Sequence, residues 1–396
     1  MKIGILTFHR SINYGAFMQT YALSHEIMRR YGDVVEVIDF EKLSKHLGYQ
    51  MKMKGFRHKI LNGNSYEIQY RRFQDDLRLL PLSTPPLITN DYEVVLDYIN
   101  NRYDIVIVGS DAVWAYNKGL GLQNPYWLFG DKLKCIKLSY AASAHSLNID
   151  SVTDDEKDYI AECLRSFTYI GVRDVTTLNL VKNCNEHLDV HMNCDPTVLL
   201  AKPDRENGLR ILRDNFGITP KKKIISIMLG RKTPLLNVAM NHLGKKDYQY
   251  VCLFRRLHWS ERFKFGSPRF LYNLSPYEWY QIFSCMDFNM TTFFHGTLLA
   301  LKSGVPTFSF DGTAMGINYV SKIKQLLTDL TLSDYLYNNT SQSVESELNF
   351  IDVLDYTIKN RDAVSKKIDD VMALERQKSD SFFAVLDTIL KKNYQK

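Results

Sequence analysis

Short apolar runs alternate with amphipathic helical patterns along most of the chain. Ile3 to Phe8 has the pattern of a buried strand, a helical pattern runs on to Arg30, and Val34 to Phe40 is the next apolar run. A strand, a glycine-containing loop, a helix and a second strand within about 40 residues form a βαβ unit. The pattern therefore predicts the beginning of an open parallel sheet.

The same alternation continues through both halves of the chain, which has 396 residues and is therefore expected to form more than one core. The polar stretch AKPDRENG divides the two halves. We expect an α/β fold with two Rossmann-like, doubly wound domains that face each other across a cleft, which resembles the GT-B architecture. The expected spans are 1–200, 208–360 and a C-terminal helix over 361–396 that docks back on the body.

Residues 41–100 interrupt the alternation and predict a basic helical insert. Between residues 42 and 72 the chain has eight Lys and Arg residues against one acid, Glu67. Apolar residues lie between these cations. One interpretation is an amphipathic surface that contacts anionic lipid or a lipid-linked phosphate, which makes 42–72 a candidate for peripheral membrane contact. The other interpretation is a solvated helical hairpin.

Polar residues follow several predicted strands in the first half. Because the carboxyl ends of parallel strands meet at one edge of a sheet, Asn13, Asp111, His145 and Arg173 are expected to lie along the same edge. Asn13 suits an N-cap as well as a ligand contact, and Asp111 suits an Asx-turn as well as a carboxylate that faces a ligand in the cleft. The residues predicted to line the cleft on this side are Asn13, Tyr14, Gly15, Trp114 and His145.

In the second half, the apolar run DFNMTT is followed by His295 and then by an apolar helical pattern. The histidine is therefore expected where a strand ends and a helix begins, beside the unpaired N–H groups of the first helical turn. Such a position suits an anion next to a titratable imidazole, but it also suits a purely structural cap.

Composition narrows the class of protein only slightly. The net charge is +6, which is too small to indicate nucleic-acid binding. The six cysteines form no CxxC pair, and no histidine cluster has zinc-ligand spacing, so we expect reduced thiols and no metal. No apolar stretch approaches the roughly 20 residues of a membrane span. These features favour a cytoplasmic protein, with peripheral contact at the inner face of the membrane as an addition.

The segments NYGAFMQTYAL, YDIVIVGSDAVW, KLSYAAS, YIGVRD, NCDPTVLL and TTFFHGTLLALKSGVP follow one another in an order that resembles the polysaccharide pyruvyl transferase family. The resemblance runs from Lys2 to about Leu332. It implies a GT-B-like fold and the transfer of the enolpyruvyl carbons of phosphoenolpyruvate to two hydroxyls of a sugar, which gives a cyclic pyruvate ketal. The acceptors it implies are cell-surface glycans or their lipid-linked precursors.

The resemblance carries over to only a few residues. His295 matches the helix-start histidine of the family and is the candidate for donor binding or acid catalysis, while Asp111 or His145 is the candidate base. The side of the cleft lined by Asn13, Tyr14, Gly15, Trp114 and His145 is then expected to bind the acceptor. Phosphoenolpyruvate serves as the donor, and no cofactor is expected. Many members have arginine two residues before the histidine, where this chain has Phe293. The residues predicted to bind the donor and its phosphate are Gly296, Thr297, Arg173, Arg231, Lys232 and Arg255.

Two other functions share parts of this pattern. A GT-B glycosyltransferase that uses a nucleotide-sugar donor would have the same architecture and a helix-start phosphate site. A non-catalytic module that binds glycans would show binding without turnover.

Overall fold

The computed structural model describes residues 1–54, 65–115, 122, 124–129, 133–145, 149–219, 221–230, 233–244, 246–253, 269–311, 321–338 and 343–394. These residues fall into two compact units. The N-terminal unit runs from Met1 to Leu199 and takes up the chain again from Arg376. The C-terminal unit contains the described residues between 200 and 375.

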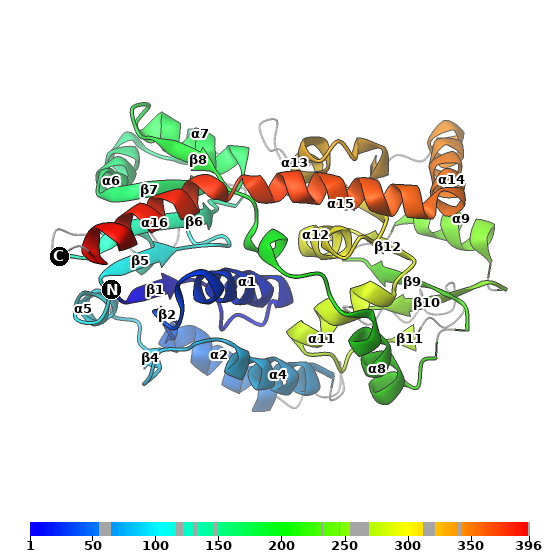
Figure 1. The fold of residues 1–396 in the computed structure, drawn as a ribbon, viewed down its shortest axis with the longest axis horizontal. Helices are drawn as coiled ribbons and strands as arrows, with labels where there is room; N and C mark the ends of the chain where they lie inside the picture. The colour runs from blue at the N-terminus through cyan, green and yellow to red at the C-terminus, as the bar shows by residue number, and fades with distance from the viewer. Residues whose placement is uncertain are drawn as a thin grey trace. The chain divides into compact units, whose positions relative to one another are not determined.

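The N-terminal unit is built on a six-stranded sheet with the order β2-β1-β5-β6-β7-β8, and every pair in it is parallel (Figure 1). All residues of β1 and β5 are buried, as expected for central strands covered on both faces. The strands are β1 (Ile3–Leu6), β2 (Val35–Val37), β5 (Ile105–Val108), β6 (Ile136–Ala142), β7 (Phe167–Val172) and β8 (Val190–Met192).

Five helices flank this sheet: α1 (Tyr14–Tyr31), α5 (Tyr92–Asn100), α6 (Asp154–Arg165), α7 (Val175–Cys184) and α16 (Asp380–Tyr394). Their starts follow local signals in the sequence. Asp174 caps α7 by accepting a hydrogen bond from the Thr177 N–H, and Thr153 forms a capping box with Glu156 at α6. Short 3₁₀ helices lie at Leu77–Leu79, Pro125–Trp127, Ile149–Ser151 and Pro196–Leu199.

The insert contains the helices α2 (Leu43–Lys54) and α4 (Ser65–Asp76), as the sequence pattern predicts. It also contains a small parallel sheet that the pattern does not predict, made of β3 (Phe40–Glu41) and β4 (Leu87–Ile88). Strands of two residues are too short to show a period of two in the sequence.

The C-terminal unit has a second parallel sheet, with the order β11-β10-β9-β12-β13-β14. Its strands are β9 (Lys223–Met228), β10 (Tyr248–Cys252), β11 (Arg269–Phe270), β12 (Phe288–Thr291), β13 (Thr307–Asp311) and β14 (Leu336–Asn338). Its helices are α8 (Arg205–Phe216), α9 (Pro234–Leu243), α11 (Pro276–Gln281), α12 (Phe294–Lys302), α13 (Lys322–Asp329), α14 (Val344–Lys359) and α15 (Arg361–Gln377), with 3₁₀ helices at Ile282–Cys285 and Ser333–Tyr335.

The end of the chain differs from the expected single helix over 361–396. It forms α15 and α16, separated by a turn at residues 378–379 in which the Ser379 N–H donates to the Arg376 carbonyl. Neither proline nor glycine marks this turn, so the sequence gives no stop signal. The rings of Phe382 and Tyr140 meet edge to face, which packs α16 on the N-terminal sheet. No helix in the described ranges is both long enough and apolar enough to span a membrane.

Candidate active site

Each sheet has a point where the chain reverses the direction in which it adds strands. In the N-terminal sheet the chain goes from β1 outward to β2 and later enters on the other side with β5. In the C-terminal sheet β9 and β12 flank the corresponding point. Open parallel sheets bind ligands outside the carboxyl ends of the strands at such switch points. Asp111 follows β5 and His295 follows β12, so each lies at the switch point of its own unit.

The turn after β5 gives Asp111 an unusual backbone. Its φ is 77°, in the left-handed region that residues with a side chain rarely adopt. The preceding Gly109 has φ 112°, and a Cβ on it would lie 2.3 Å from the Tyr140 carbonyl oxygen, so only glycine fits there. Thr7 Oγ1, at the end of β1, donates to the Ser110 carbonyl at 3.0 Å. Strain of this kind is concentrated at functional sites.

The Asp111 side chain is half-buried. Its Oδ1 accepts a hydrogen bond from the Ala112 N–H at 2.8 Å, which is the turn geometry that the sequence suggested. Within the described residues this is the only hydrogen bond to the carboxylate, so its second oxygen can still accept a proton or a hydrogen bond. The Asx-turn interpretation and the catalytic interpretation are therefore compatible.

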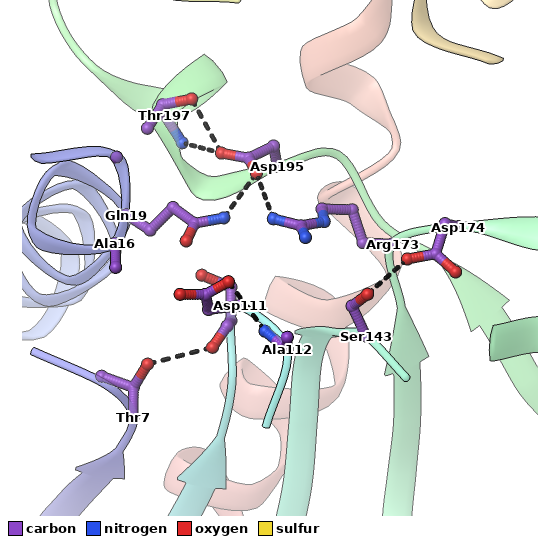
Figure 2. A network of polar contacts seen from close by, with 12 residues as sticks. Thr7, Ala16, Gln19, Asp111, Ala112, Ser143, Arg173, Asp174, Asp195 and Thr197 are labelled. Atoms are coloured by element: carbon purple, nitrogen blue, oxygen red, sulfur yellow. Dashed lines mark hydrogen bonds and ion pairs between the residues drawn. The ribbon is translucent and has the colours of Figure 1, made fainter. Parts of the chain in front are cut away.

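A buried network lies next to Asp111 (Figure 2). Arg173, directly after β7, donates from Nη1 to Asp195 Oδ2 at 2.8 Å. Gln19 of α1 donates from Nε2 to the same oxygen at 2.6 Å. The other oxygen of Asp195 accepts hydrogen bonds from the Thr197 N–H and hydroxyl, at 3.0 and 2.7 Å. The network thus holds the Arg173 guanidinium at the carboxyl edge of the sheet.

The charges around Arg173 suit a cation in a buried place. Burial alone would lower the pKa of the guanidinium, but the negative charges of Asp195, Asp111 and Asp174 outweigh burial and raise this pKa. Asp111 is thus close enough to Arg173 to act on it electrostatically. Arg173 and Asp111 are two of the predicted site residues, whereas Asp195 and Gln19, which hold Arg173 in place, were not singled out from the sequence.

His145 lies on the same edge but is exposed, with φ 62°. Its backbone N–H donates to Ser143 Oγ at 3.0 Å, and that hydroxyl donates to Asp174 Oδ2 at 2.6 Å. The turn after β6 is thereby fixed, and the imidazole is left on the surface.

Three residues predicted for the acceptor side are instead buried. Trp114 is fully buried: its ring stacks on Trp127 at 5.0 Å, and its Nε1 donates to the Tyr126 carbonyl. Tyr14 is buried against Phe73, and Gly15 is buried within α1. Packing in the core accounts for the positions of the Trp114 and Tyr14 rings, and contact of these residues with a ligand stays a prediction.

Asn13 acts as the N-cap of α1. Its Oδ1 accepts hydrogen bonds from the N–H groups of Gly15 and Ala16, at 3.0 and 3.3 Å. The N-cap interpretation of the sequence is therefore confirmed for its side-chain oxygen.

In the C-terminal unit, His295 is the second residue of α12 and is half-buried. Its ring meets the Phe294 ring edge to face, with centroids 5.1 Å apart. The N-cap residue is Phe293, which provides no side-chain cap to the helix. The expected strand-to-helix position of the histidine is confirmed, and the side-chain cap interpretation is not needed.

The residues around His295 explain how this helix start is held. The Phe293 N–H donates to Thr291 Oγ1 at 3.0 Å. A Cβ on Gly296 would lie 2.6 Å from that same oxygen, so glycine is required for α12 to approach β12. The Thr297 hydroxyl donates to the Phe293 carbonyl and contacts Ser309 Oγ at 2.8 Å. Thr297 is fully buried, so its hydroxyl holds the helix start in place, and its expected part in donor binding stays a prediction.

Phe293 stands two residues before His295, where the resemblance led us to expect an arginine. A Cβ on Gly230, just after β9, would lie 3.0 Å from the edge of the Phe293 ring. The ring therefore covers the backbone at the switch point of the C-terminal unit. The predicted donor-binding residues Arg231, Lys232 and Arg255 lie outside the described residues.

A comparison with protein-family models matches polysaccharide pyruvyl transferase over residues 13–312. The chain belongs to the polysaccharide pyruvyl transferase family. The match includes Asp111, Arg173 and His295 and covers both switch points. Membership in this family makes the chain a transferase. The comparison with curated proteins gave no match.

Solved structures show the GT-B-type fold of this pyruvyl transferase family member. UDP-GlcNAc 2-epimerase from Neisseria meningitidis, bound to UDP-GlcNAc, is similar with a TM-score of 0.56 and 12% identity, covering 98% of this chain and 100% of the epimerase. A putative UDP-N-acetylglucosamine 2-epimerase from Listeria monocytogenes has a TM-score of 0.57 and 12% identity, over 99% and 97%. Anabaena HepE in complex with UDP and glucose has a TM-score of 0.51 and 10% identity, over the whole of both chains. At such identities the likeness concerns the fold alone.

Proposed function

We propose that the protein transfers the enolpyruvyl group of phosphoenolpyruvate to two hydroxyls of a sugar and so forms a cyclic pyruvate ketal. The acceptor is a cell-surface polysaccharide or its lipid-linked precursor. The observation that carries this proposal is the family match over residues 13–312, which includes both switch-point residues. Asp111 and His295 are the residue types that proton transfer requires.

The reaction needs one acid and one base. Protonation of C3 of phosphoenolpyruvate turns its CH₂ group into a methyl group and leaves positive charge at C2. One sugar hydroxyl adds to C2 and loses its proton. The C2–O bond to phosphate then breaks, the second hydroxyl forms the second C–O bond, and its proton goes to the leaving phosphate. We assign the first proton transfer to His295 and the second to Asp111.

Each unit, taken by itself, has a group that suits a charged part of the donor. The helix α12 has nine residues, and the first N–H groups of this helix, beside His295, favour an anion. Arg173, whose charge is maintained by its carboxylate neighbours, suits a carboxylate or phosphate. The donor is a substrate, and the proposed chemistry requires no separate cofactor.

The test is incubation of the wild-type protein with phosphoenolpyruvate and a panel of methyl glycosides. The expected products are inorganic phosphate and a glycoside whose mass has increased by one pyruvate ketal. A parallel incubation with UDP- and GDP-sugars tests the glycosyltransferase alternative. Glycan binding without turnover, unchanged in His295→Ala, would support the non-catalytic alternative.

We further propose that the protein works at the cytoplasmic face of a membrane and that α2 contacts anionic lipid. On this helix Leu43, Leu47 and Met51 are spaced four residues apart and are 39%, 47% and 74% exposed. Residues four apart share one face of a helix, so the three side chains form an exposed apolar stripe within the basic segment 42–72. An apolar stripe among cations is the pattern of an interfacial helix.

A further inference from the structure

Of the two polar atoms in the Gln19 amide, one is hydrogen-bonded, and the other is buried with no partner among the described residues. The residue is 1% exposed, and its Nε2 donates to Asp195 Oδ2 at 2.6 Å. An amide oxygen at that distance from a carboxylate would be repelled, so the orientation of the amide is set. In the described part of the chain the remaining atom, Oε1, has no hydrogen-bond partner. Figure 2 shows Asp111 on the side of Gln19 that faces away from Asp195.

Ser110 presents a second atom of the same kind. It is 2% exposed and lies between Gly109 and Asp111 in the turn after β5. Its backbone oxygen accepts the hydrogen bond from Thr7, but among the described residues its hydroxyl oxygen has no partner. Buried polar atoms are almost always hydrogen-bonded, and two exceptions around one carboxylate at a switch point indicate a ligand.

The chemistry of these atoms limits what the ligand can be. Gln19 Oε1 only accepts hydrogen bonds, and so does an ionised Asp111 carboxylate. The Ser110 hydroxyl can both donate and accept. A phosphate or carboxylate would face repulsion from two acceptors, whereas a hydroxyl group can donate to one of them. The set therefore suits a polyhydroxylated ligand.

We propose that Gln19 and Ser110 bind the acceptor sugar and hold its reacting hydroxyls beside Asp111. This inference rests on the proposed pyruvyl transfer. Gln19 Oε1 accepts a hydrogen bond from one hydroxyl, and Asp111 accepts the proton that another hydroxyl loses when its oxygen bonds to C2 of the donor. Ser110 orients the hydroxyl next to Asp111. The sequence analysis missed Gln19 because it is a polar residue inside an otherwise apolar helical face.

The Ser110→Ala variant gives the sharpest test. It removes a buried hydroxyl that has no partner among the described residues, so the fold loses no hydrogen bond, and the Tm is expected to stay equal or rise. The kcat/KM for the acceptor is expected to fall about tenfold or more, as when a site loses a hydrogen bond to substrate. Ser24→Ala is the matched control, because Ser24 is also buried but donates to the Thr20 carbonyl within α1. It is expected to keep full activity.

The Gln19→Met variant keeps the volume of the side chain but removes the amide. It also removes the hydrogen bond to Asp195, which holds Arg173. An effect of the variant on the position of Arg173 therefore has to be separated from an effect on acceptor binding. The expected result is an acceptor KM raised about tenfold, with the KM for phosphoenolpyruvate unchanged. Equal increases in both constants would overturn the assignment.

Methyl glycosides that each lack one hydroxyl group can show which hydroxyl Gln19 or Ser110 binds. Removal of one reacting hydroxyl from the glycoside is expected to weaken its binding to the wild type. In Ser110→Ala or Gln19→Met, the same removal is expected to have little further effect on binding. Binding is measured by saturation-transfer NMR without phosphoenolpyruvate. If the loss of binding from the deoxy glycoside and the loss from the protein substitution simply added up, these atoms would hold an ordered water, and the proposal would be overturned. Because this binding is measured without the donor, it is independent of turnover. A wild type that binds the glycosides but forms no ketal would refute pyruvyl transfer while leaving the binding assignment to be decided by the same variants.

Discussion

Arg173 and Asp195 form a buried ion pair, with Nη1 2.8 Å from Oδ2, and their side chains are 6% and 3% exposed. The pair joins the end of β7 to the segment after β8, two neighbouring strands of the N-terminal sheet. A charge this deeply buried is tolerated only when it is paired and hydrogen-bonded. The pair therefore places a permanent cation at the carboxyl edge near Asp111.

Replacing Asp195 with Asn should show what this pair contributes. The Asp195→Asn variant loses the full negative charge opposite Arg173, and breaking a buried pair typically lowers the free energy of unfolding by about 3–5 kcal/mol. Because Asp111 and Asp174 also act on Arg173, we expect about 3 kcal/mol, measured by urea unfolding. Asp214→Asn is the control, since its ion pair with Arg213 is largely exposed and should contribute less than about 1 kcal/mol. Equal effects of the two substitutions would contradict the role of burial.

Removal of the imidazole from α12 tests the proposed acid. His295→Ala should lower kcat at least about 100-fold, the usual contribution of a positioned general acid, and keep the far-UV circular dichroism of the wild type. His242→Ala is the control, because His242 belongs to the same unit and pairs with Asp355 at the surface. Near wild-type turnover of His295→Ala would rule out the acid role.

The strand and helix pattern predicts both sheets because central parallel strands are apolar on both faces and helices have a 3.6-residue period. The same reasoning predicts the strand-to-helix position of His295. It fails for Trp114, since a motif at a strand end does not reveal whether a large ring turns toward solvent or toward the ring of Trp127. It also misses Asp195, because the partner of a buried carboxylate depends on contacts between residues distant in sequence.

Asp111 offers a test in which stability and activity move in opposite directions. The Asp111→Gly variant relieves a backbone at φ 77°, so the free energy of unfolding should rise by about 1 kcal/mol. Because glycine has no carboxylate, activity should fall at least about 100-fold. Asp111→Asn, which tolerates the same backbone, should lose activity without the gain in stability. If Asp111→Gly retained wild-type activity, the carboxylate would not be the base.

Glu26 provides a prediction about pH. This buried carboxylate of α1 accepts hydrogen bonds from Arg29, Arg30 and Arg376. Burial alone would raise its pKa, but the hydrogen bonds from Arg29 and Arg30 and the charge of Arg376 outweigh burial and lower the pKa from 4.5 to about 2. A pKa that is lower in the folded state stabilises the protein above the unfolded pKa, and this contribution is lost as the pH falls from 4.5 toward 2.

The Glu26→Gln variant should therefore be less stable than the wild type at pH 7 by roughly 3–4 kcal/mol, given a pKa lowered from 4.5 to about 2 and about 1.4 kcal/mol per pKa unit. The difference should shrink as the pH falls through the interval between 4.5 and 2. The measurement is urea unfolding at a series of pH values. A difference that stays constant down to pH 2 would show that the effect comes from packing and not from charge.

The apolar stripe on α2 leads to a prediction about membrane binding. Full burial of a leucine or methionine side chain contributes about 1.5–3 kcal/mol, and partial insertion into the lipid interface contributes part of this. The Leu47→Gln and Met51→Gln double variant should therefore bind vesicles containing anionic phospholipid at least about tenfold more weakly, as measured by sedimentation. The control is the Val344→Gln and Leu348→Gln double variant, since these α14 residues are 76% and 57% exposed but lie outside the basic segment. Because the stripe and the cations of 42–72 act together, wild-type binding should also fall as salt is added. Equal weakening in both double variants, or binding that does not depend on anionic lipid, would show that α2 is a solvated surface helix.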